Sequence, residues 1–237
     1  MVVEQINPDS YKRIVFFTGA GMSAESGVPT YRGKGGILDK YNWQEVASQE
    51  AWEKHPKKVL KFHEKRRTEG LKCKPHSGHK VIADLEKFHP NVWIVTQNID
   101  GMHQQAGSKK VVELHGSVWR VRCPKEGRVW EDSKKTKYSR QKCKCGSWLR
   151  PDIVWFSDYL DTKVTDKADE VISRADLFIS IGTSGLVWPA AGYPARAKSA
   201  GAFLVEINPE PSEQSNYYDK VYPGKAGEVM PQLFGVK

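Results

Sequence analysis

The sequence predicts an α/β fold in which a doubly wound parallel sheet carries helices on both faces. Amphipathic stretches predict helices at residues 77–88, 165–174, 189–199 and 227–234. Short runs rich in β-branched and aromatic residues predict strands between them, at residues 13–18, 91–96, 111–114, 176–181 and 202–207. Alternating strands and helices are typical of a parallel sheet buried on both faces. We therefore expect a Rossmann-like domain that comprises residues 1–33, 77–116 and 151–237.

Two basic segments interrupt this alternation and hold the net charge of +9. Residues 54–80 carry 10 basic and 2 acidic side chains, and residues 117–150 carry 11 basic and 3 acidic ones, whereas the rest of the chain sums to −7. The first segment has a helical pattern, so we expect residues 34–76 to form the helical part of a small domain. The second lacks an extended apolar run and contains three of the four cysteines, which indicates a small inserted module.

Composition argues against several other classes of protein. The 237 residues include 39% apolar side chains and 20 Gly, unlike disordered, collagen-like or coiled-coil chains. No apolar run approaches the roughly 18 residues of a transmembrane helix, and the N-terminal sequence lacks the pattern of a secretory signal. Four cysteines are too few for a disulfide scaffold at this length, which favours a reducing compartment. We expect a cytoplasmic globular protein with no membrane partner.

Polar residues follow three of the predicted strands and indicate a nucleotide site. Ligands of such sheets bind beyond the carboxyl ends of the strands. Each signal is weak alone, since Gly, Ser and Asn also close ordinary turns, but together they favour a dinucleotide. The first is Gly19-Ala20-Gly21, whose backbone N–H groups could approach a pyrophosphate, and the others are Gly182-Thr183-Ser184 and the pair Asn208 and Glu210.

Two further predicted strands end in side chains that could orient a ligand or act in catalysis. Gln97-Asn98-Ile99-Asp100 supplies two amides and a carboxylate that could orient a carboxamide or a sugar. His115 follows a strand and precedes Gly116, where an imidazole could act as a general base near neutral pH. A lone histidine is more often a structural residue, and none of the other six has a comparable setting at a strand end.

Five motifs together resemble the sirtuins, the NAD-dependent protein-lysine deacylases. GAGMSAESGVPTYRG, TQNIDGMHQQAG, ELHGS, IGTSG and INPE occur in the order and approximate spacing of that family, from about Arg13 to Phe234. The resemblance implies that the acyl-lysine carbonyl oxygen attacks the ribose of NAD, giving nicotinamide, free lysine and O-acyl-ADP-ribose. Target proteins are therefore the expected partners, and NAD the expected cofactor.

The resemblance also implies roles for individual residues. His115, Asn98 and Asp100 would be catalytic, with His115 as the general base that takes a proton from the ribose. Tyr31 stands where Phe is usual in the family. The NAD-binding residues would be Gly19, Ala20, Gly21, Ala24, Glu25, Tyr31, Arg32, Gln97, Asn98, Ile99, Asp100, Gly182, Thr183, Ser184, Asn208, Glu210 and Ala226.

Substrate recognition is expected at two places. The substrate backbone would add as a strand between Val154-Trp155-Phe156 and the turn of Gly185 and Val187. Sirtuins that remove succinyl and malonyl groups carry Tyr-x-x-Arg where this chain has His63-x-x-Arg66. Residues i and i+3 share a helix face, and an Arg fork matches a carboxylate. We expect acetyl removal and, through this pair, succinyl or malonyl removal; the alternative is a solvated basic helix face.

The inserted module, residues 117–150, stands where sirtuins carry a zinc ribbon with paired cysteines. This chain offers only Cys123, Cys143 and Cys145, and position 126 is Glu. Since a closed structural zinc site needs four ligands, the cysteines could bind zinc with Glu126 or a water. Alternatively the metal is lost and three tryptophans, Trp119, Trp130 and Trp148, form a substitute core.

Three other functions compete with deacylation. A sirtuin-like protein ADP-ribosyltransferase would use the same cofactor. An NAD-dependent oxidoreductase fits poorly, because Ala24 interrupts the dehydrogenase fingerprint. A non-catalytic nucleic-acid-binding module could use the basic segment, although the placement of the charge in two short segments argues against nucleic acid as the primary ligand. We expect a monomer.

Overall fold

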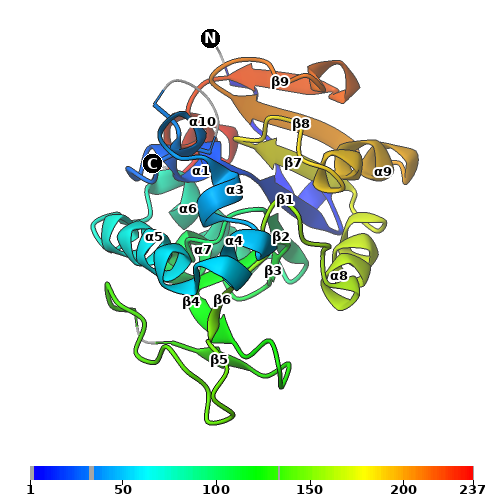
Figure 1. Cartoon of the computed structure of the whole chain (residues 1–237). Coiled ribbons are helices and arrows are strands. Elements are labelled where there is room, and N and C mark those ends of the chain that lie inside the picture. The colour runs from blue at the N-terminus through cyan, green and yellow to red at the C-terminus, as the bar shows by residue number, and fades with distance from the viewer. Residues whose placement is uncertain (1–2, 32–34, 133, 237) are drawn as a thin grey trace.

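A six-stranded parallel sheet forms the centre of the molecule (Figure 1). The computed structural model describes residues 3–31, 35–132 and 134–236. The strand order β3-β2-β1-β7-β8-β9 places β1 and β7 in the middle. The bounds are β1 (Ile14–Thr18), β2 (Val92–Thr96), β3 (Val111–Glu113), β7 (Leu177–Ile181), β8 (Phe203–Asn208) and β9 (Lys220–Pro223). The edge strand β9 was not predicted, because it is half-exposed and lacks an apolar run.

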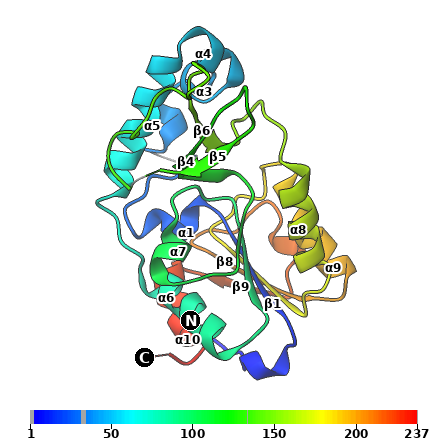
Figure 2. The ribbon, with the colours of Figure 1, turned by 90° about the horizontal axis from the view of Figure 1, so that it is seen from below.

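Helices cover both faces of this sheet, which confirms the predicted doubly wound architecture. Ile14 and Phe16 face α6 (Ser77–Phe88) and α10 (Ala226–Leu233), whereas Val15 and Phe17 face α8 (Thr162–Ile172) and α9 (Tyr193–Ser199). Figure 2 shows these two pairs of helices on opposite sides of the strands. Burying each such side chain contributes about 1.5–3 kcal/mol to folding. The continuously apolar sequence of β1 follows from this two-sided burial.

Capping decides where the predicted helices begin. α6 begins at Ser77, as predicted, because the His76 Nδ1 atom accepts a hydrogen bond from the Gly78 N–H at 3.0 Å. α8 begins at Thr162, before the predicted start, because the Asp161 carboxylate accepts from the Lys163 N–H at 2.8 Å. Among the described residues, no helix has both the length and the apolar character needed to span a membrane.

A second unit with its own core, here called the small domain, packs beside the main sheet. It combines a three-stranded antiparallel sheet, order β5-β4-β6, with four helices. Its strands were not predicted, because β4 alternates apolar and polar residues instead of forming a continuous apolar run. The bounds are α2 (Ile37–Lys40), α3 (Trp43–Val46), α4 (Gln49–Lys54), α5 (Pro56–Gly70), β4 (Gly116–Arg122), β5 (Val129–Glu131) and β6 (Arg150–Ile153).

A buried ion pair joins α5 to this small sheet. Arg67 is fully buried, its Nη1 atom lies 2.7 Å from the Asp132 carboxylate, and its Nε atom donates to the Lys135 carbonyl at 2.8 Å. The guanidinium also lies over the ring of Tyr138, 4.2 Å from its centroid. These contacts fix the position of α5, the helix that carries His63 and Arg66.

Candidate active site

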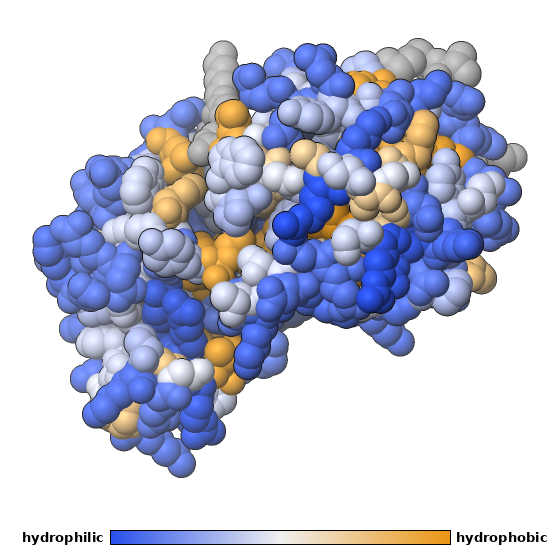
Figure 3. All heavy atoms as spheres, turned by 90° about the vertical axis from the view of Figure 1, so that its right-hand side faces the viewer, coloured by the Kyte–Doolittle hydropathy of each residue, from blue (hydrophilic) through white to orange (hydrophobic). Residues whose placement is uncertain are grey.

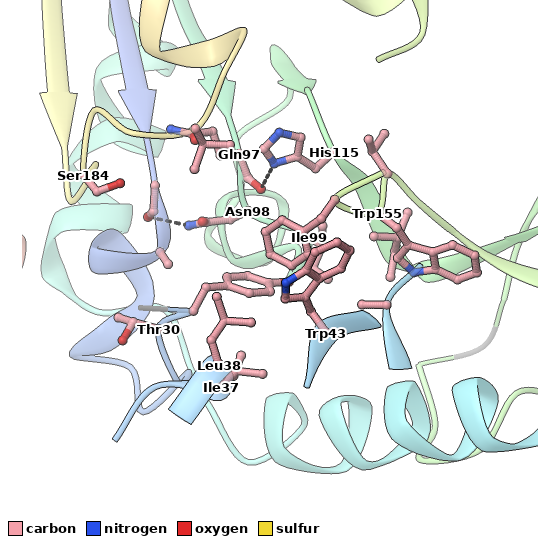
Figure 4. Close-up of a pocket in the computed structure, with 18 of the residues that line it drawn as sticks. Thr30, Ile37, Leu38, Trp43, Gln97, Asn98, Ile99, His115, Trp155 and Ser184 are labelled. Carbon is pink, nitrogen blue, oxygen red and sulfur yellow. Dashed lines mark hydrogen bonds between the residues drawn. The ribbon is translucent and has the colours of Figure 1, made fainter. Parts of the chain in front are cut away.

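A cavity of about 800 Å³ lies between the carboxyl ends of the parallel strands and the small domain. Figure 3 shows apolar surface in the hollow between the lower lobe and the rest of the molecule. The volume suits a dinucleotide together with an extended side chain. In Figure 4, Asn98 and Ser184 lie on the side of the sheet, and Ile37, Leu38 and Trp43 lie on the side of the small domain.

The structure brings most of the predicted site residues to this cavity. Ala24, Glu25, Arg66, Asp100, Gly185, Glu210 and Ala226 are not among the lining residues, and Arg32 lies outside the described residues. The predicted residues that line it are Gly19, Ala20, Gly21, Tyr31, His63, Gln97, Asn98, Ile99, His115, Val154, Trp155, Phe156, Gly182, Thr183, Ser184, Val187 and Asn208.

Glycines let two loops meet at the floor of the cavity. The Gly21 N–H donates to the Gly182 carbonyl at 3.0 Å, and the Gly19 N–H donates to the Ile181 carbonyl at 2.9 Å. A Cβ atom on Gly182 would lie 2.2 Å from the Met22 nitrogen, and its φ of +63° lies in the left-handed region. Only glycine therefore permits this backbone contact, which leaves space for a phosphate group above it.

Two asparagines at strand ends have their amide N–H groups fixed. Asn98 Nδ2 donates to the Gly19 carbonyl at 2.8 Å and to Ser23 Oγ at 3.3 Å. Asn208 Nδ2 donates to the Thr183 carbonyl at 3.0 Å and to the buried Glu206 carboxylate at 2.8 Å. With both N–H bonds used, each asparagine offers a ligand only its Oδ1 acceptor, which suits a hydroxyl or amide donor.

His115 is held in one tautomer. Its Nδ1 atom lies 2.9 Å from the Gln97 carbonyl (Figure 4), and because a carbonyl can only accept, Nδ1 carries the proton. Nε2 is therefore the basic nitrogen of the ring. Burial lowers the pKa of His115, and the Gln97 hydrogen bond offsets this only in part. The imidazole is thus neutral and able to accept a proton at pH 7.

The Asp100 carboxylate faces its own loop. Its Oδ1 atom accepts from the Met102 N–H at 2.9 Å, while its backbone carbonyl accepts from Trp119 Nε1 at 2.6 Å. Burial raises the pKa of this carboxyl against the opposing effect of the hydrogen bonds from the Met102 N–H and from Ser23 and of the Arg66 charge. In this structure Asp100 therefore supports the Ile99 loop from behind the cavity wall.

Aromatic side chains enclose the end of the cavity in the small domain. Phe156 packs against Tyr31 and Trp43, with ring centroids 6.1 and 5.4 Å apart, and Tyr41 packs against Phe62 at 5.1 Å. Of these walls, Tyr31 and Phe156 were predicted from the sequence, whereas Tyr41, Trp43 and Phe62 were not, and neither were Ile37, Leu38 and Val46. Apolar residues carry no chemical signature, and only the fold reveals that they share a pocket.

His63 lies at the end of this aromatic enclosure. Its Nε2 atom accepts from Trp155 Nε1 at 3.2 Å, so Nδ1 carries the proton, and Nδ1 is buried with no hydrogen-bond partner among the described residues. Burial, followed by the charges of Arg66 and Arg150, lowers the pKa of His63 to about 3. Arg66 lies with its guanidinium over the Tyr31 ring, 5.1 Å from the centroid.

A buried arginine supports Trp155 from behind. The Arg150 guanidinium lies 3.6 Å from the centroid of the Trp155 ring and donates to the Asp158 carboxylate at 2.7 Å. Asp158 also accepts from the Trp155 N–H at 3.2 Å. Asp158 was not among the site residues predicted from the sequence. The structure gives Asp158 the task of holding the predicted substrate edge.

The three cysteines of the module form one cluster. Their Sγ atoms all lie within 4.8 Å of one another, with Cys123 and Cys145 3.6 Å apart. Burial raises the pKa of the Cys123 thiol, but the backbone N–H groups of Glu126 and Lys125 and the neighbouring thiols lower it more. Sulfur atoms converging beside N–H donors fit a bound zinc ion, so this donor set is compatible with a zinc module.

Comparison with known proteins identifies the class to which this fold and site belong. The Sir2 family model matches residues 19–189, and the chain belongs to the Sir2 family. It is 46% identical to the NAD-dependent protein deacylase 2 of Pyrobaculum aerophilum, over 94% of this chain and 90% of that protein. It is 42% identical to the NAD-dependent protein deacylase of Aquifex aeolicus, over 93% of both chains.

Solved structures of Sir2 homologues share the fold. One, a complex of a Sir2 homologue with NAD, is 41% identical, with a TM-score of 0.87 over 94% of this chain and 88% of that one. Another, a mutant Sir2 homologue with ADP-ribose, is 38% identical, with a TM-score of 0.89 over 96% of this chain and 95% of that one.

Proposed function

We propose that this chain removes acyl groups from lysine side chains of proteins and consumes NAD as it does so. The chain is an NAD-dependent protein-lysine deacylase, as its family and its named relatives support. The observation that carries the residue-level proposal is the position of His115. Its fixed tautomer leaves Nε2 as the base in a cavity with a glycine floor at one end and an aromatic enclosure at the other.

The glycine floor and the two asparagines are proposed to hold NAD. The contact between Gly21 and Gly182 leaves room for the pyrophosphate, and Thr183 and Ser184 offer hydroxyls beside it. Asn208 Oδ1 would accept from an adenosine hydroxyl, and Asn98 Oδ1 from the ribose or carboxamide at the other end. Bound NAD supplies the electrophilic ribose carbon and the group that accepts the acyl chain.

His115 is proposed to take the proton from the ribose hydroxyl. The Gln97 carbonyl holds Nδ1–H, so the ring cannot rotate without losing a hydrogen bond, and Nε2 keeps one direction. Such a positioned base typically accelerates a reaction by about 10²–10⁴-fold. The buried surroundings also exclude water that would compete for the reactive carbon.

The substrate backbone is proposed to lie between two chain segments. Val154, Trp155 and Phe156 line the cavity on one side, and Val187 lines it on the other. The Arg150–Asp158 pair keeps the first segment in place. An extended peptide added there would place one side chain in every two toward the cavity, which selects a single acyl-lysine.

The acyl group is proposed to enter the aromatic enclosure. Its walls suit an acetyl group, and the His63 Nδ1–H can donate to a polar atom on a longer acyl chain. A succinyl or malonyl carboxylate would further require Arg66 to leave the Tyr31 ring and pair with it. Acetyl removal is thus compatible with the structure as it stands, and removal of acidic acyl groups requires one side-chain movement.

The reaction is tested with acetyl-, malonyl- and succinyl-lysine peptides and NAD, using mass spectrometry of the products. We expect nicotinamide and O-acyl-ADP-ribose in equal amounts. His115→Ala should lower turnover by at least about 100-fold while NAD still binds, whereas His55→Ala, an exposed histidine outside the cavity, should have no effect. Transfer of ADP-ribose to the peptide would instead support the ADP-ribosyltransferase alternative.

The acyl preference is tested with Arg66→Met. We expect desuccinylation to fall at least about tenfold while deacetylation is retained, because an Arg–carboxylate pair serves only the acidic substrate. Lys61→Met, an exposed residue of the same helix, is the matched control. Intact desuccinylation in Arg66→Met would show that this arginine does not recognise the acyl carboxylate.

We further propose that the chain acts as a monomer in the cytoplasm and that nucleic acid is not its primary ligand. The four free thiols support a reducing compartment. Light scattering of the purified protein should give the mass of one chain, and peptide turnover should not respond to added DNA.

A further inference from the structure

Glu206 is a fully buried acid of the main sheet that has no cation beside it. It lies in β8, two residues before Asn208, so the two side chains point to the same face of the sheet. In the described part of the chain its carboxylate forms no ion pair, and Lys198 of the helix α9 that covers this face pairs with Asp219 instead. A buried charge without a counter-ion is costly, so we looked for what it contributes to the site.

Two hydrogen bonds hold the Glu206 carboxylate, and a donor supplies each of them. Asn208 Nδ2 donates to its Oε1 atom at 2.8 Å, and Ser215 Oγ donates to its Oε2 atom. Hydrogen bonds to the charged form of a carboxyl favour that form, so these donors stabilise the ionised state. Ser215 begins the short 3₁₀ helix η3 (Ser215–Tyr217), so the carboxylate also joins this loop to the strand.

This charge lies behind the proposed NAD-binding end of the cavity. Asn208 lines the cavity, and its Nδ2 atom donates both to Glu206 and to the Thr183 carbonyl, at 2.8 and 3.0 Å. The amide therefore cannot turn over without losing two hydrogen bonds, and Oδ1 remains the atom offered to a ligand. From the carboxylate to a hydroxyl bound at Oδ1, two hydrogen bonds and the amide group together span at most about 8 Å.

A phosphate group on that hydroxyl would be repelled twice. It offers acceptor oxygens in place of the hydroxyl proton, so it would face the acceptor Oδ1 of Asn208. It would also approach the charge of Glu206. At about 8 Å and an effective dielectric constant of about 20, the repulsion between two unit charges changes an equilibrium about 30-fold. A neutral ribose hydroxyl meets neither penalty.

We propose that Glu206 positions Asn208 and, through its buried charge, excludes dinucleotides that carry a phosphate on the 2′-hydroxyl of the adenosine ribose, as NADP does. The inference rests on the proposed function, which places an adenosine hydroxyl of NAD at Asn208. In many dinucleotide-binding sheets an acidic residue contacts the ribose directly. Here the acid stands one layer behind the contact, so Glu206 is a positioning and selectivity residue and not a catalytic one.

Calorimetric titration of the full chain with NAD and with NADP tests the role of the charge. We expect the unaltered chain to bind NADP at least about 30-fold more weakly than NAD. Glu206→Gln removes the charge but keeps the shape, because the glutamine Oε1 can accept from Asn208 and its Nε2 can donate to Ser215 Oγ. This variant should lower the ratio of NAD affinity to NADP affinity by at least about tenfold. Glu213→Gln, at an exposed acid of the same loop, should leave the ratio unchanged.

A third ligand separates charge repulsion from the loss of a hydrogen bond and needs no variant. 2′-Deoxy-NAD lacks the hydroxyl but carries no added charge, so the unaltered chain should bind it at least about tenfold more tightly than NADP. Equal affinity for these two ligands would overturn the repulsion, as would an unchanged NAD to NADP ratio in Glu206→Gln.

The positioning role has its own measurement. Glu206→Ala removes a hydrogen bond that holds Asn208, so its affinity for NAD itself should fall at least about fivefold. Undiminished NAD affinity in this variant would overturn the positioning of Asn208 by Glu206. These outcomes leave the proposed function intact, whereas a lack of NAD binding by the unaltered chain would overturn the proposed function and this inference together.

Discussion

At the scale of single residues, backbone contacts prepare the side chains of the site. The Gln97 carbonyl fixes the His115 tautomer, and the Gly19 and Thr183 carbonyls fix the amides of Asn98 and Asn208. Each side chain then offers the cavity only an acceptor. A ligand that donates hydrogen bonds, such as a ribose, is favoured over one that only accepts them.

The lowered pKa of His115 has a consequence for the pH profile. Its neutral form is the base, so kcat/KM should be lost as the pH falls through the pKa of the folded protein, which lies below the ordinary 6.5. We therefore expect activity at pH 6.5 to exceed half of its plateau and to fall further at lower pH. A profile that is already half-reduced at or above pH 6.5 would contradict this role.

Gly182 should tolerate no side chain. Gly182→Ala places a methyl group 2.2 Å from the Met22 nitrogen, so we expect the two loops to separate and NAD affinity to fall by at least about tenfold. Gly201→Ala is the matched control, since Gly201 also has positive φ but has nothing within 4 Å of the added carbon. Calorimetric titration would measure the NAD affinity of both variants. Equal losses of affinity would show that the positive φ of the glycine causes the effect and not the steric clash with Met22.

At the scale of elements, helix α5 both lines the cavity and anchors itself in the small domain. His63 lines the cavity, while Arg67 is buried in the small sheet and pairs with Asp132. The rigidity of the proposed acyl end of the cavity therefore depends on the attachment of this helix to the module. The sequence showed a basic run, and it could not show that one of two adjacent arginines is fully buried.

Removing the charge of Arg67 should destabilise the small domain. Arg67→Met leaves the Asp132 carboxylate without its partner, which typically costs about 3–5 kcal/mol. Urea unfolding followed by tryptophan fluorescence would measure the loss, because Trp119 lies beside the guanidinium. Lys61→Met, on the exposed side of α5, should change stability by less than about 0.5 kcal/mol. A similar midpoint for both variants would exclude a structural role for the ion pair.

At the scale of the whole molecule, buried neutral histidines set a limit on acid stability. His79 and His103 are almost fully buried, with ring centroids 5.0 Å apart, and the His76 ring lies 4.3 Å from His79. Burial is the main cause that lowers the pKa of His79 to about 2 and that of His103 to about 3. These histidines therefore stay neutral in the folded chain at pH values at which they are protonated in the unfolded chain.

Stability should therefore fall on acidification. Above pH 6.5 neither state binds these protons, and below it the unfolded state gains them, so the loss grows from about pH 6.5 towards pH 3. Each such histidine adds up to about 1.4 kcal/mol per pH unit. Chemical unfolding at pH 7.5, 6.0 and 5.0 would measure the slope, and His79→Gln should reduce it. A free energy of unfolding independent of pH in this range would refute the prediction.

The sequence predicted the main sheet because each of its central strands is a continuous apolar run, as in residues 14–18. It predicted the proposed NAD-binding end of the cavity because Gly, Asn and His follow such strands at one edge. It missed β4, where Val118, Trp119 and Val121 are buried between polar neighbours, and most of the aromatic enclosure, of which only Tyr31 and Phe156 were predicted. Those features depend on contacts between segments far apart in the chain, such as Trp43 with Phe156.

The two ends of the cavity belong to different hydrophobic cores. Phe62, Val46 and Ile37, at the proposed acyl end, are part of the core of the small domain, whereas the glycine floor follows strands of the large sheet, which has its own core. Substitutions at one end need not disturb packing at the other. Acyl selectivity and cofactor recognition can therefore be altered separately, and grafting residues 36–66 from a relative onto this chain should transfer the donor's acyl preference.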